Sequence, residues 1–168
     1  MKTYIVRFVA VLAMSAAFAS PVFAEGMTTE ETRALMKEFL KYQHSGKKED
    51  MDKWAAFYAD DVEAHYHTTG PLGVYFFGKK GLVKWYKDGA EHMNFETGMK
   101  VDLRALIVEG NVAVVRLRNR SRMMGAPYVQ EYVHIYTWED NKIVYMEGFN
   151  NGEASRATRD IAKRLAGG

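Results

Sequence analysis

The stretch from Trp54 to His67 changes its hydrophobic period in the middle, and this change decides the fold. It reads Trp-Ala-Ala-Phe-Tyr-Ala-Asp-Asp-Val-Glu-Ala-His-Tyr-His. Trp54, Phe57 and Tyr58 recur at helical spacing, whereas the residues after Asp61 alternate in chemistry, as a half-buried strand does. One face of that strand carries Val62, Ala64 and Tyr66, and the other carries Glu63, His65 and His67. We therefore expect a helix-to-strand junction that forms one wall of an apolar pocket.

Three helices are expected in the first half of the chain. The first begins with a capping box, in which Thr28 is the N-cap and Glu31 is the third helical residue. Asp50 is expected to cap the second helix, and Gly78 precedes the third. Their apolar faces carry Leu35, Met36, Phe39 and Leu40 in the first helix, Met51, Trp54, Ala55 and Tyr58 in the second, and Leu82, Trp85 and Tyr86 in the third.

The second half of the chain switches to a period of two, which indicates strands. We expect four strands, over residues 97–109, 112–123, 128–139 and 142–150, joined by hairpin turns. Earlier in the chain, Val74-Tyr75-Phe76-Phe77 predicts either a short buried strand or an apolar lip at a pocket mouth. Helices followed by a meander predict an α+β fold, because a long twisted sheet can curl around the helices. The expected shape is a cone, in which a curved antiparallel or mixed sheet wraps around three N-terminal helices and encloses an apolar cavity.

The first 24 residues have the features of a cleaved secretory signal. Lys2 and Arg7 precede an apolar run from Phe8 to Phe18, and small residues lead to a cleavage site after Ala24. The run is shorter than the roughly 20 residues that a membrane span requires. We therefore expect a periplasmic or secreted protein with one domain over residues 25–168 and no membrane attachment after cleavage.

The charge and cysteine content exclude some functions. The predicted mature chain keeps all 21 acidic residues and loses two of its 23 basic ones, so its net charge is zero. Nucleic acid is not an expected partner, because its binding depends on a basic field. The chain has no cysteine, so disulfides and thiol chemistry are excluded. With 48% hydrophobic and 13% aromatic residues, the material for a packed core is present.

Strand 112–123 carries arginines on one face only. The apolar face holds Ala113, Val115 and Leu117, so the outer face of the sheet receives Arg116, Arg118, Arg120 and Arg122. These arginines predict either anion binding, a subunit interface, or a solvated face that cross-strand acids such as Glu131 and Glu147 neutralise. We favour the solvated face over anion binding, and we expect a homodimer through the outer sheet face.

Four short motifs resemble one known superfamily when their order is considered together. They are Phe57-Tyr58-Ala59-Asp60-Asp61-Val62, Gly78-Lys79-Lys80, Gly110-Asn111-Val112-Ala113-Val114 and Trp138-Glu139-Asp140-Asn141-Lys142-Ile143. Each is loose alone, but their spacing resembles the nuclear transport factor 2-like superfamily, which includes the SnoaL-like polyketide cyclases and the ketosteroid isomerases. The resemblance covers about Thr29 to Asn150.

The resemblance implies which side chains face the cavity. They are Tyr66, Val115, Leu117, Asn119, Tyr132, His134, Met146, Gly148 and Asn150. It also implies that the two functional aspartates of the isomerases fall at Tyr66 and His134, and that their first-helix tyrosine falls near Phe39. Because all three positions differ, a steroid isomerase mechanism is not expected.

The function that we expect is the binding of a small hydrophobic molecule, without a cofactor. The predicted ligand-binding residues are Asn119, Tyr132, Asn150, Trp54, Tyr58, Leu117 and Met146. The alternative is a cofactor-independent isomerase, cyclase or dehydratase acting on a hydrophobic carbonyl compound. In that alternative His134 is the general base and Tyr66 donates a hydrogen bond to the developing oxyanion.

The spacing Glu63-x-His65-x-His67 offers a further possibility, because two histidines on one strand face can chelate a metal. The sequence supplies no evident third or fourth ligand, and this face of the strand points away from the expected cavity. A metal site is therefore not predicted.

Overall fold

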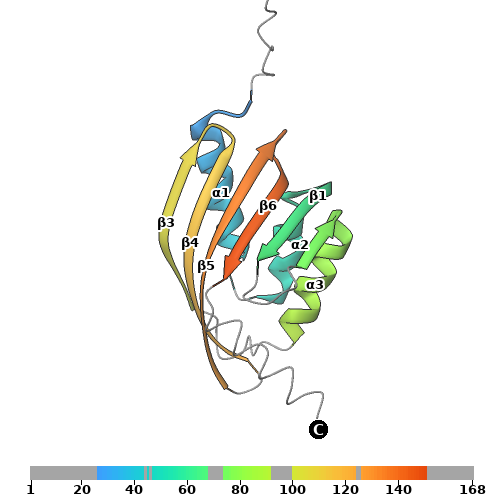
Figure 1. Cartoon of the computed structure of the whole chain (residues 1–168), viewed down its shortest axis with the longest axis vertical. Helices are drawn as coiled ribbons and strands as arrows, with labels where there is room; N and C mark the ends of the chain where they lie inside the picture. The colour runs from blue at the N-terminus through green and yellow to red at the C-terminus, as the bar shows by residue number, and fades with distance from the viewer. Residues whose placement is uncertain are drawn as a thin grey trace, which may run out of the picture.

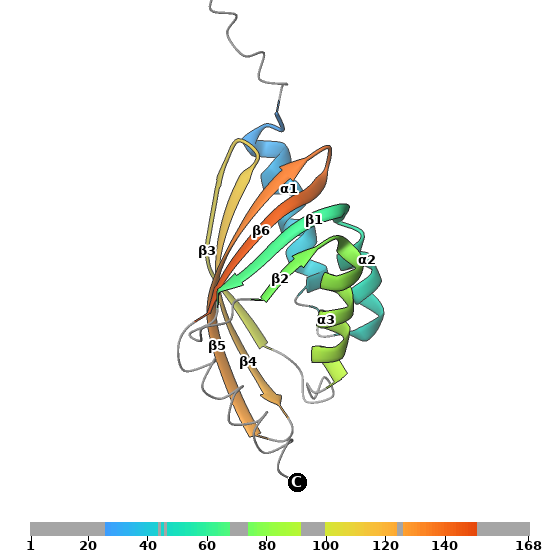
Figure 2. The same ribbon diagram turned by 45° about the vertical axis from the view of Figure 1, so that its right-hand side comes forward.

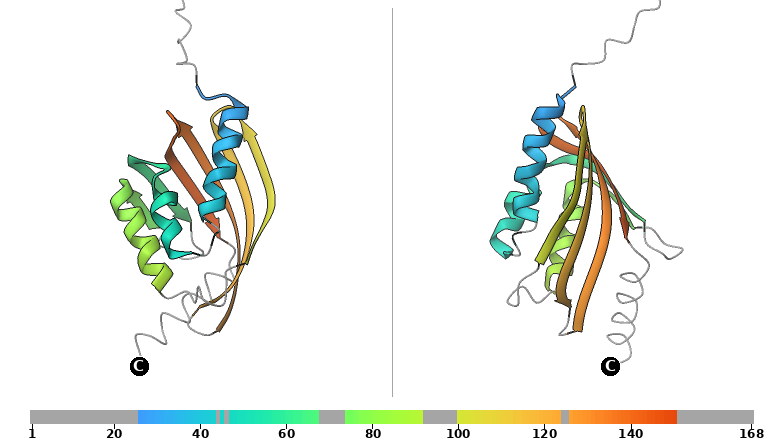
Figure 3. Two further views of the ribbon diagram at one scale, coloured as in Figure 1. Left: turned by 180° about the vertical axis from the view of Figure 1, so that it is seen from behind. Right: turned by 90° about the vertical axis from the view of Figure 1, so that its left-hand side faces the viewer.

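The computed structural model describes residues 26–43, 45, 47–67, 74–91, 100–123 and 126–150. The predicted signal peptide, residues 1–24, lies outside the described residues. The described residues form one six-stranded sheet in the order β2-β1-β6-β5-β4-β3, with the helices packed on one face (Figure 1). Seen from behind, the helices lie in front of the sheet (Figure 3). The α+β fold predicted from the sequence is confirmed.

The bounds of the elements follow the chain from the N-terminus. The helices are α1 (Thr29–Gln43), the single 3₁₀ turn η1 (Lys48–Asp50), α2 (Met51–Ala55) and α3 (Lys79–Glu91). The strands are β1 (Tyr58–His67), β2 (Val74–Phe77), β3 (Lys100–Glu109), β4 (Val112–Met123), β5 (Ala126–Glu139) and β6 (Lys142–Asn150). None of the helices among these residues has the length and apolar character required to cross a membrane.

Helix α1 begins at the predicted capping box. The backbone N–H of Thr28 donates to Glu31 Oε2 at 2.9 Å, and the N–H of Glu31 donates to Thr28 Oγ1 at 3.3 Å. This reciprocal pair satisfies two backbone donors that a helix start leaves open. The buried face of the helix is Thr32, Met36, Phe39 and Leu40. The expected capping box is confirmed.

The second helix is shorter than the sequence predicted. It ends at Ala55, and Tyr58 already belongs to β1. Tyr58 pairs in parallel with Ile143 of β6, and the N–H of Ile143 donates to the carbonyl of Phe57 at 2.8 Å. This pairing ends the helix, because Tyr58 becomes part of the sheet. The helical spacing of apolar residues gives no information about a strand partner so far along the chain. Asp50 is at the N-cap position, but its side chain makes no cap hydrogen bond and instead pairs with Lys53 at 2.8 Å.

The segment Val74–Phe77 is a short strand at the edge of the sheet, antiparallel to β1. Val74 and Phe76 are half-buried, whereas Tyr75 and Phe77 are exposed. The strand interpretation is therefore right, but only one face of the strand is buried.

Strands β3 to β6 form the expected meander, and their bounds differ from the predicted ones by a few residues. The β3–β4 turn uses Gly110 at φ +54°, and the β5–β6 turn uses Asp140 and Asn141 at φ +47° and +62°. In the β5–β6 turn, positive φ at both central residues matches the right-handed twist of a hairpin. The sheet curves around the helices, and β4 and β5 extend furthest at one end (Figure 2).

The face of the sheet that meets the helices, called the inner face below, has the predicted parity. On β4 it carries buried Ala113, Val115, Leu117 and Asn119, and on β5 buried Tyr132, His134, Tyr136 and Trp138. The aromatic core forms around Phe39 of α1, whose ring lies 5.2 Å from Tyr136 and 6.3 Å from Trp138 between centroids. Arg116, Arg118 and Arg120 of β4 follow the opposite parity and lie on the outer face, whereas the side chain of Arg122 is outside what the structure describes.

Candidate functional site

One row of the inner face joins the two predicted catalytic residues. In the sheet register, Tyr66 of β1 lies opposite Gly148 of β6, and Gly148 lies opposite His134 of β5. Both side chains are almost fully buried, with 3% of Tyr66 and 4% of His134 exposed. The sheet therefore brings two residues that are 68 positions apart in the chain to the two sides of a single glycine.

Gly148 is the residue that allows the two rings to meet. A β-carbon at this position would lie 2.9 Å from Tyr66 Cδ1 and 3.0 Å from His134 Cδ2, closer than real β-carbons approach their neighbours. The Tyr66 and His134 rings meet edge to face, with centroids 5.8 Å apart and planes at 81°. The sequence singled out Gly148 only as an inward position, because parity does not report the space between neighbouring strands.

The polar ends of these two rings bind other partners. The hydroxyls of Tyr66 and Tyr86 lie 2.6 Å apart, and the Tyr66 hydroxyl also donates to Met146 Sδ at 3.1 Å. His134 Nδ1 lies 2.9 Å from the hydroxyl of Tyr136. Tyr86 belongs to α3 and Tyr136 to β5, so the site includes two tyrosines that the sequence did not assign to it.

Gln43, at the end of α1, connects the two halves of this network. Its side chain hydrogen-bonds Tyr86 and Tyr136, and these bonds act to lower the pKa of both phenols. The Gln43 Oε1 atom is buried and has no hydrogen-bond partner among the described residues. We therefore assign the two bonds to the amide N–H groups of Gln43.

Burial keeps the tyrosines of the site protonated well into the alkaline pH range. It raises the pKa of Tyr58, Tyr66 and Tyr136 well above the ordinary value near 10, and it raises the pKa of Tyr86 to about 12. At neutral pH these side chains are uncharged phenols. They can donate hydrogen bonds to a ligand oxygen, but they are not bases.

The contact between His134 and Tyr136 links the role of the imidazole to its tautomer. If Nδ1 carries the proton and donates to the Tyr136 oxygen, Nε2 has a lone pair and can accept a proton. If the Tyr136 hydroxyl donates to Nδ1 instead, Nε2 carries the proton and serves as a donor. The geometry thus allows His134 to act as a base or as a hydrogen-bond donor.

Four predicted ligand-binding residues lie on the inner face next to this row. Tyr132 lies opposite both Leu117 and Asn150, and its ring is tilted by 37° to that of His134, with centroids 4.5 Å apart. Asn119 is the next inward-facing residue of β4 after Leu117, and it is also buried. Asn150 Oδ1 is buried without a hydrogen-bond partner in the part of the chain that the structure describes.

The other three predicted ligand-binding residues lie deeper, toward the helices. Trp54 and Tyr58 pack against Phe39 in the aromatic core, and their own rings are 5.0 Å apart. The Tyr58 hydroxyl reaches Met146 Sδ at 3.8 Å. Met146 therefore connects the aromatic core to the Tyr66 side of the site.

The histidines of β1 lie on the outer face of the sheet, away from this site, as the alternation predicted. His67 Nε2 lies 2.7 Å from Glu147 Oε1, and its ring stacks on Phe149 at 4.7 Å. His65 lies beside the carboxylate of Glu63. In the described part of the chain, no group of three or more His, Cys, Asp or Glu side chains is arranged to hold a metal ion.

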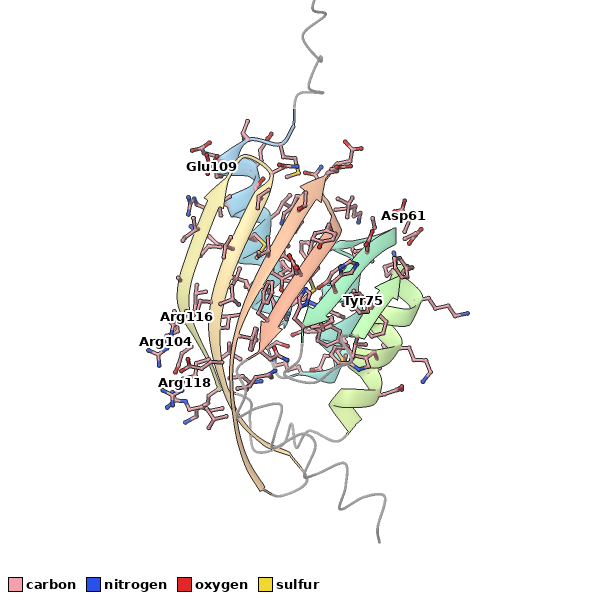
Figure 4. All side chains as sticks on the ribbon, viewed as in Figure 1. Asp61, Tyr75, Arg104, Glu109, Arg116 and Arg118 are labelled. Carbon is pink, nitrogen blue, oxygen red and sulfur yellow. The ribbon has the colours of Figure 1, made fainter. Side chains whose placement is uncertain are left out.

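The arginines of the outer face share two carboxylates. Arg120 and Arg104 lie 2.8 and 3.4 Å from Asp102, whereas Arg116 and Arg118 lie 3.5 and 3.7 Å from Glu131. The sequence also assigned Glu147 to these arginines, but Glu147 pairs with His67, so that assignment is wrong. Four arginines against two carboxylates leave an excess of positive charge on β3 and β4, where Figure 4 shows Arg104, Arg116 and Arg118 together.

A sequence profile of the SnoaL-like domain matches residues 41–146, which run from the end of α1 to the first half of β6. The chain belongs to the SnoaL-like domain family. The match includes Tyr66 and His134, whereas Gly148 and Asn150 lie just beyond it. No curated protein matches the chain.

Solved structures agree with the fold of this SnoaL-like domain. A nuclear transport factor 2-like protein from Anabaena variabilis is 14% identical with a TM-score of 0.64, over 74% of this chain and 92% of that one. PrhC from Penicillium brasilianum is 16% identical with a TM-score of 0.66, over 83% and 90%. An LEH-like epoxide hydrolase from M. tuberculosis is 13% identical with a TM-score of 0.59, over 83% and 98%. At these identities the likeness concerns the fold, which is that of the nuclear transport factor 2-like superfamily.

Proposed function

We propose that this SnoaL-like domain binds a small hydrophobic molecule with one polar group, held between the inner face of the sheet and the helices. Tyr66 and His134 are at the centre of the proposed site, with Tyr132, Asn150 and Leu117 beside them. The surrounding core supplies apolar contact area, and the hydroxyl, amide and imidazole groups supply the few polar contacts that orient a ligand.

The observation that carries this proposal is the set of buried polar atoms. Gln43 Oε1 and Asn150 Oδ1 are buried acceptors without a partner among the described residues. A buried polar atom without a partner is costly, so such atoms usually bind water or a ligand. Two acceptors near a row that already contains phenol donors mark a polar region within the apolar core. The phenols suit a ligand carbonyl, and the two acceptors suit ordered water or a ligand hydroxyl.

Calorimetric titration with two hydrophobic ketones, acetonaphthone and decalone, tests the binding proposal. We expect the wild-type protein to bind at least one of them, and His134→Phe to bind it about tenfold more weakly, because the substitution keeps a ring but removes both polar nitrogens. The matched control is His65→Phe on the outer face, which should leave the affinity unchanged. Absence of binding to both ketones would refute the proposed function.

The second candidate is a cofactor-independent isomerase, cyclase or dehydratase, and the position of His134 beside a row of phenols favours it. Proton abstraction next to a carbonyl would use His134 Nε2 in the tautomer whose Nδ1–H donates to Tyr136. The neutral phenol of Tyr66 would donate to the enolate oxygen as negative charge develops. His134→Ala should then abolish deuterium exchange next to the ketone carbonyl. Exchange that is unchanged in His134→Ala would eliminate this base.

We also propose that two copies of the domain pair through their outer faces. The β3–β4 side has four arginines against two carboxylates, and the β1–β6 side has Glu63 and Glu147. Tyr75, labelled on the β1–β2 side in Figure 4, lies across the face from Arg104, Arg116 and Arg118. A two-fold axis through the apolar middle of the face would bring the basic side of each copy onto the acidic side of the other.

A further inference from the structure

Trp85 differs from the other two tryptophans of the chain in its exposure. Trp54 and Trp138 are buried, with 3% and 0% exposed, whereas 40% of Trp85 is exposed. The helical spacing predicts Trp85 on the inward face of α3 together with Leu82, which is fully buried. Trp85 therefore lies at the boundary between the core and solvent. A large aromatic ring in such a position has a free face that a ligand can cover.

The ring of Trp85 is the outer end of a series of rings that leads to His134. It lies 4.9 Å from the ring of Tyr66, and Tyr66 in turn lies 5.8 Å from His134. Phe76 of β2 completes the corner, 5.4 Å from Trp85. The series crosses from α3 through β1 to β5, so it connects the half-exposed tryptophan with the centre of the proposed site.

The exposed part of Trp85 is where a flat molecule could stack, since 40% of the residue is open to solvent. Trp85 is tilted by 41° to Tyr66 and by 44° to Phe76, whereas Tyr66 and Phe76 meet edge to face at 77°. This group of rings also has polar atoms beside it, namely the paired hydroxyls of Tyr66 and Tyr86. A planar conjugated ketone would stack on the tryptophan and direct its oxygen toward these hydroxyls.

We propose that Trp85 is the specificity-determining residue of the ligand site and selects planar conjugated ketones over saturated ones of the same size. This inference rests on the proposed binding function, and it adds the class of ligand and the residue that recognises it. Stacking requires a π-face on the ligand, whereas burial of apolar area does not, so the two kinds of ketone should respond differently to the loss of the indole.

The experiment compares acetonaphthone, which is planar and aromatic, with decalone, which is a saturated bicyclic ketone of similar size. Calorimetry gives the Kd of both for the full chain and for Trp85→Ala, Trp85→Phe and Phe77→Ala. We expect Trp85→Ala to weaken acetonaphthone binding about two- to tenfold and to change the Kd of decalone by less than about twofold. Trp85→Phe should restore most of the loss. Phe77→Ala, which removes an exposed ring of the outer face, should change neither value.

The outcomes separate this inference from the function on which it rests. If the wild type binds both ketones equally and Trp85→Ala leaves both unchanged, the selectivity proposal is overturned and the binding function stands. An equal loss for both ketones in Trp85→Ala would also overturn it, because the indole would then act through general packing. If neither ketone binds to the wild type, both proposals fall. Circular dichroism of each variant confirms that a loss of binding does not reflect unfolding.

Discussion

Tyr66 and His134 pack against the two sides of Gly148, with ring centroids 5.8 Å apart and planes at 81°. The contact depends on the missing side chain, because a β-carbon would lie 2.9 Å from one ring and 3.0 Å from the other. The two rings belong to the strands on either side of β6 and are almost fully buried, so neither can move away cheaply. The glycine is thus a structural requirement of the site.

Substitution of this glycine should separate the two rings. We expect Gly148→Ala to lower the free energy of unfolding by about 1–3 kcal/mol, as overpacking of a dense core does. The measurement is denaturant unfolding followed by circular dichroism. The control is Gly81→Ala in α3, where the nearest side-chain atom is 3.6 Å from the added carbon. That variant should be stabilised by about 0.5–1 kcal/mol, because alanine favours a helix. Equal stability of Gly148→Ala and the wild type would contradict the packing described above.

The hydroxyl pair of Tyr66 and Tyr86 should behave as one coupled unit. Each single substitution to Phe removes the 2.6 Å bond and should cost about 0.5–1.5 kcal/mol of unfolding free energy. The double variant should cost less than the sum of the two, because the second substitution no longer leaves a buried hydroxyl without its partner. Tyr58→Phe is the comparison, since its hydroxyl lies outside this pair and makes a long hydrogen bond to Met146 Sδ at 3.8 Å. Strictly additive costs would show that the two hydroxyls are not coupled.

The buried phenols predict a loss of stability in alkali. Burial raises the pKa of Tyr58, Tyr66 and Tyr136 well above 10 and that of Tyr86 to about 12. The folded state therefore favours the protonated phenol. Its contribution to stability is complete below the unfolded pKa near 10, and it is lost as the pH rises through the folded values. For Tyr86 the window is from about pH 10 to about 12.

Tyrosinate absorbance measured against pH, with circular dichroism on the same samples, checks this prediction. Part of the absorbance change from the ten tyrosines should follow the ordinary titration of exposed phenols. The rest should appear together with the loss of secondary structure. A single reversible titration of all tyrosines near pH 10, with the secondary structure intact, would show that the inner-face phenols are accessible to solvent.

The proposed pairing of outer faces predicts a charge dependence of the dimer. Arg116→Glu and Glu147→Lys should each weaken self-association by about tenfold, and the double variant should recover part of the loss, since the two positions face each other across the proposed axis. Sedimentation equilibrium at two salt concentrations gives the dissociation constants, and the association should weaken as salt rises. A wild-type protein that is monomeric at all accessible concentrations would disprove the pairing.

Strand faces were the part of the fold that the sequence predicted well. Alternation in β4 placed Val115 and Leu117 inside and Arg116 outside, and the structure agrees. A period of two is a local property, so it can be read without knowledge of the partners. The end of the second helix was predicted wrongly because Tyr58 is held by β6, some 85 residues later in the chain. Non-local pairing of this kind leaves no periodic signal.

The site was predictable only in part for the same reason. The resemblance to the nuclear transport factor 2-like superfamily placed Tyr66 and His134 on one face, but the partners of their polar atoms come from α1, α3 and β5. Gln43 has no sequence feature that indicates a link between Tyr86 and Tyr136, because that link depends on how the helices pack on the sheet. Likewise, Glu147 has the right parity to meet an arginine, but the cross-strand neighbour within its reach is His67.

Ligand should bind on the inner face of the sheet, around Tyr66, Gly148 and His134. Heteronuclear NMR spectra of protein labelled on its histidine nitrogens test it directly, because His134 lies on the inner face and His65 and His67 lie on the outer one. On titration with acetonaphthone, the His134 signals should shift with the Kd that calorimetry gives, while the signals of His65 and His67 stay in place. Saturable binding that shifts the outer-face histidines and leaves His134 unchanged would contradict the account.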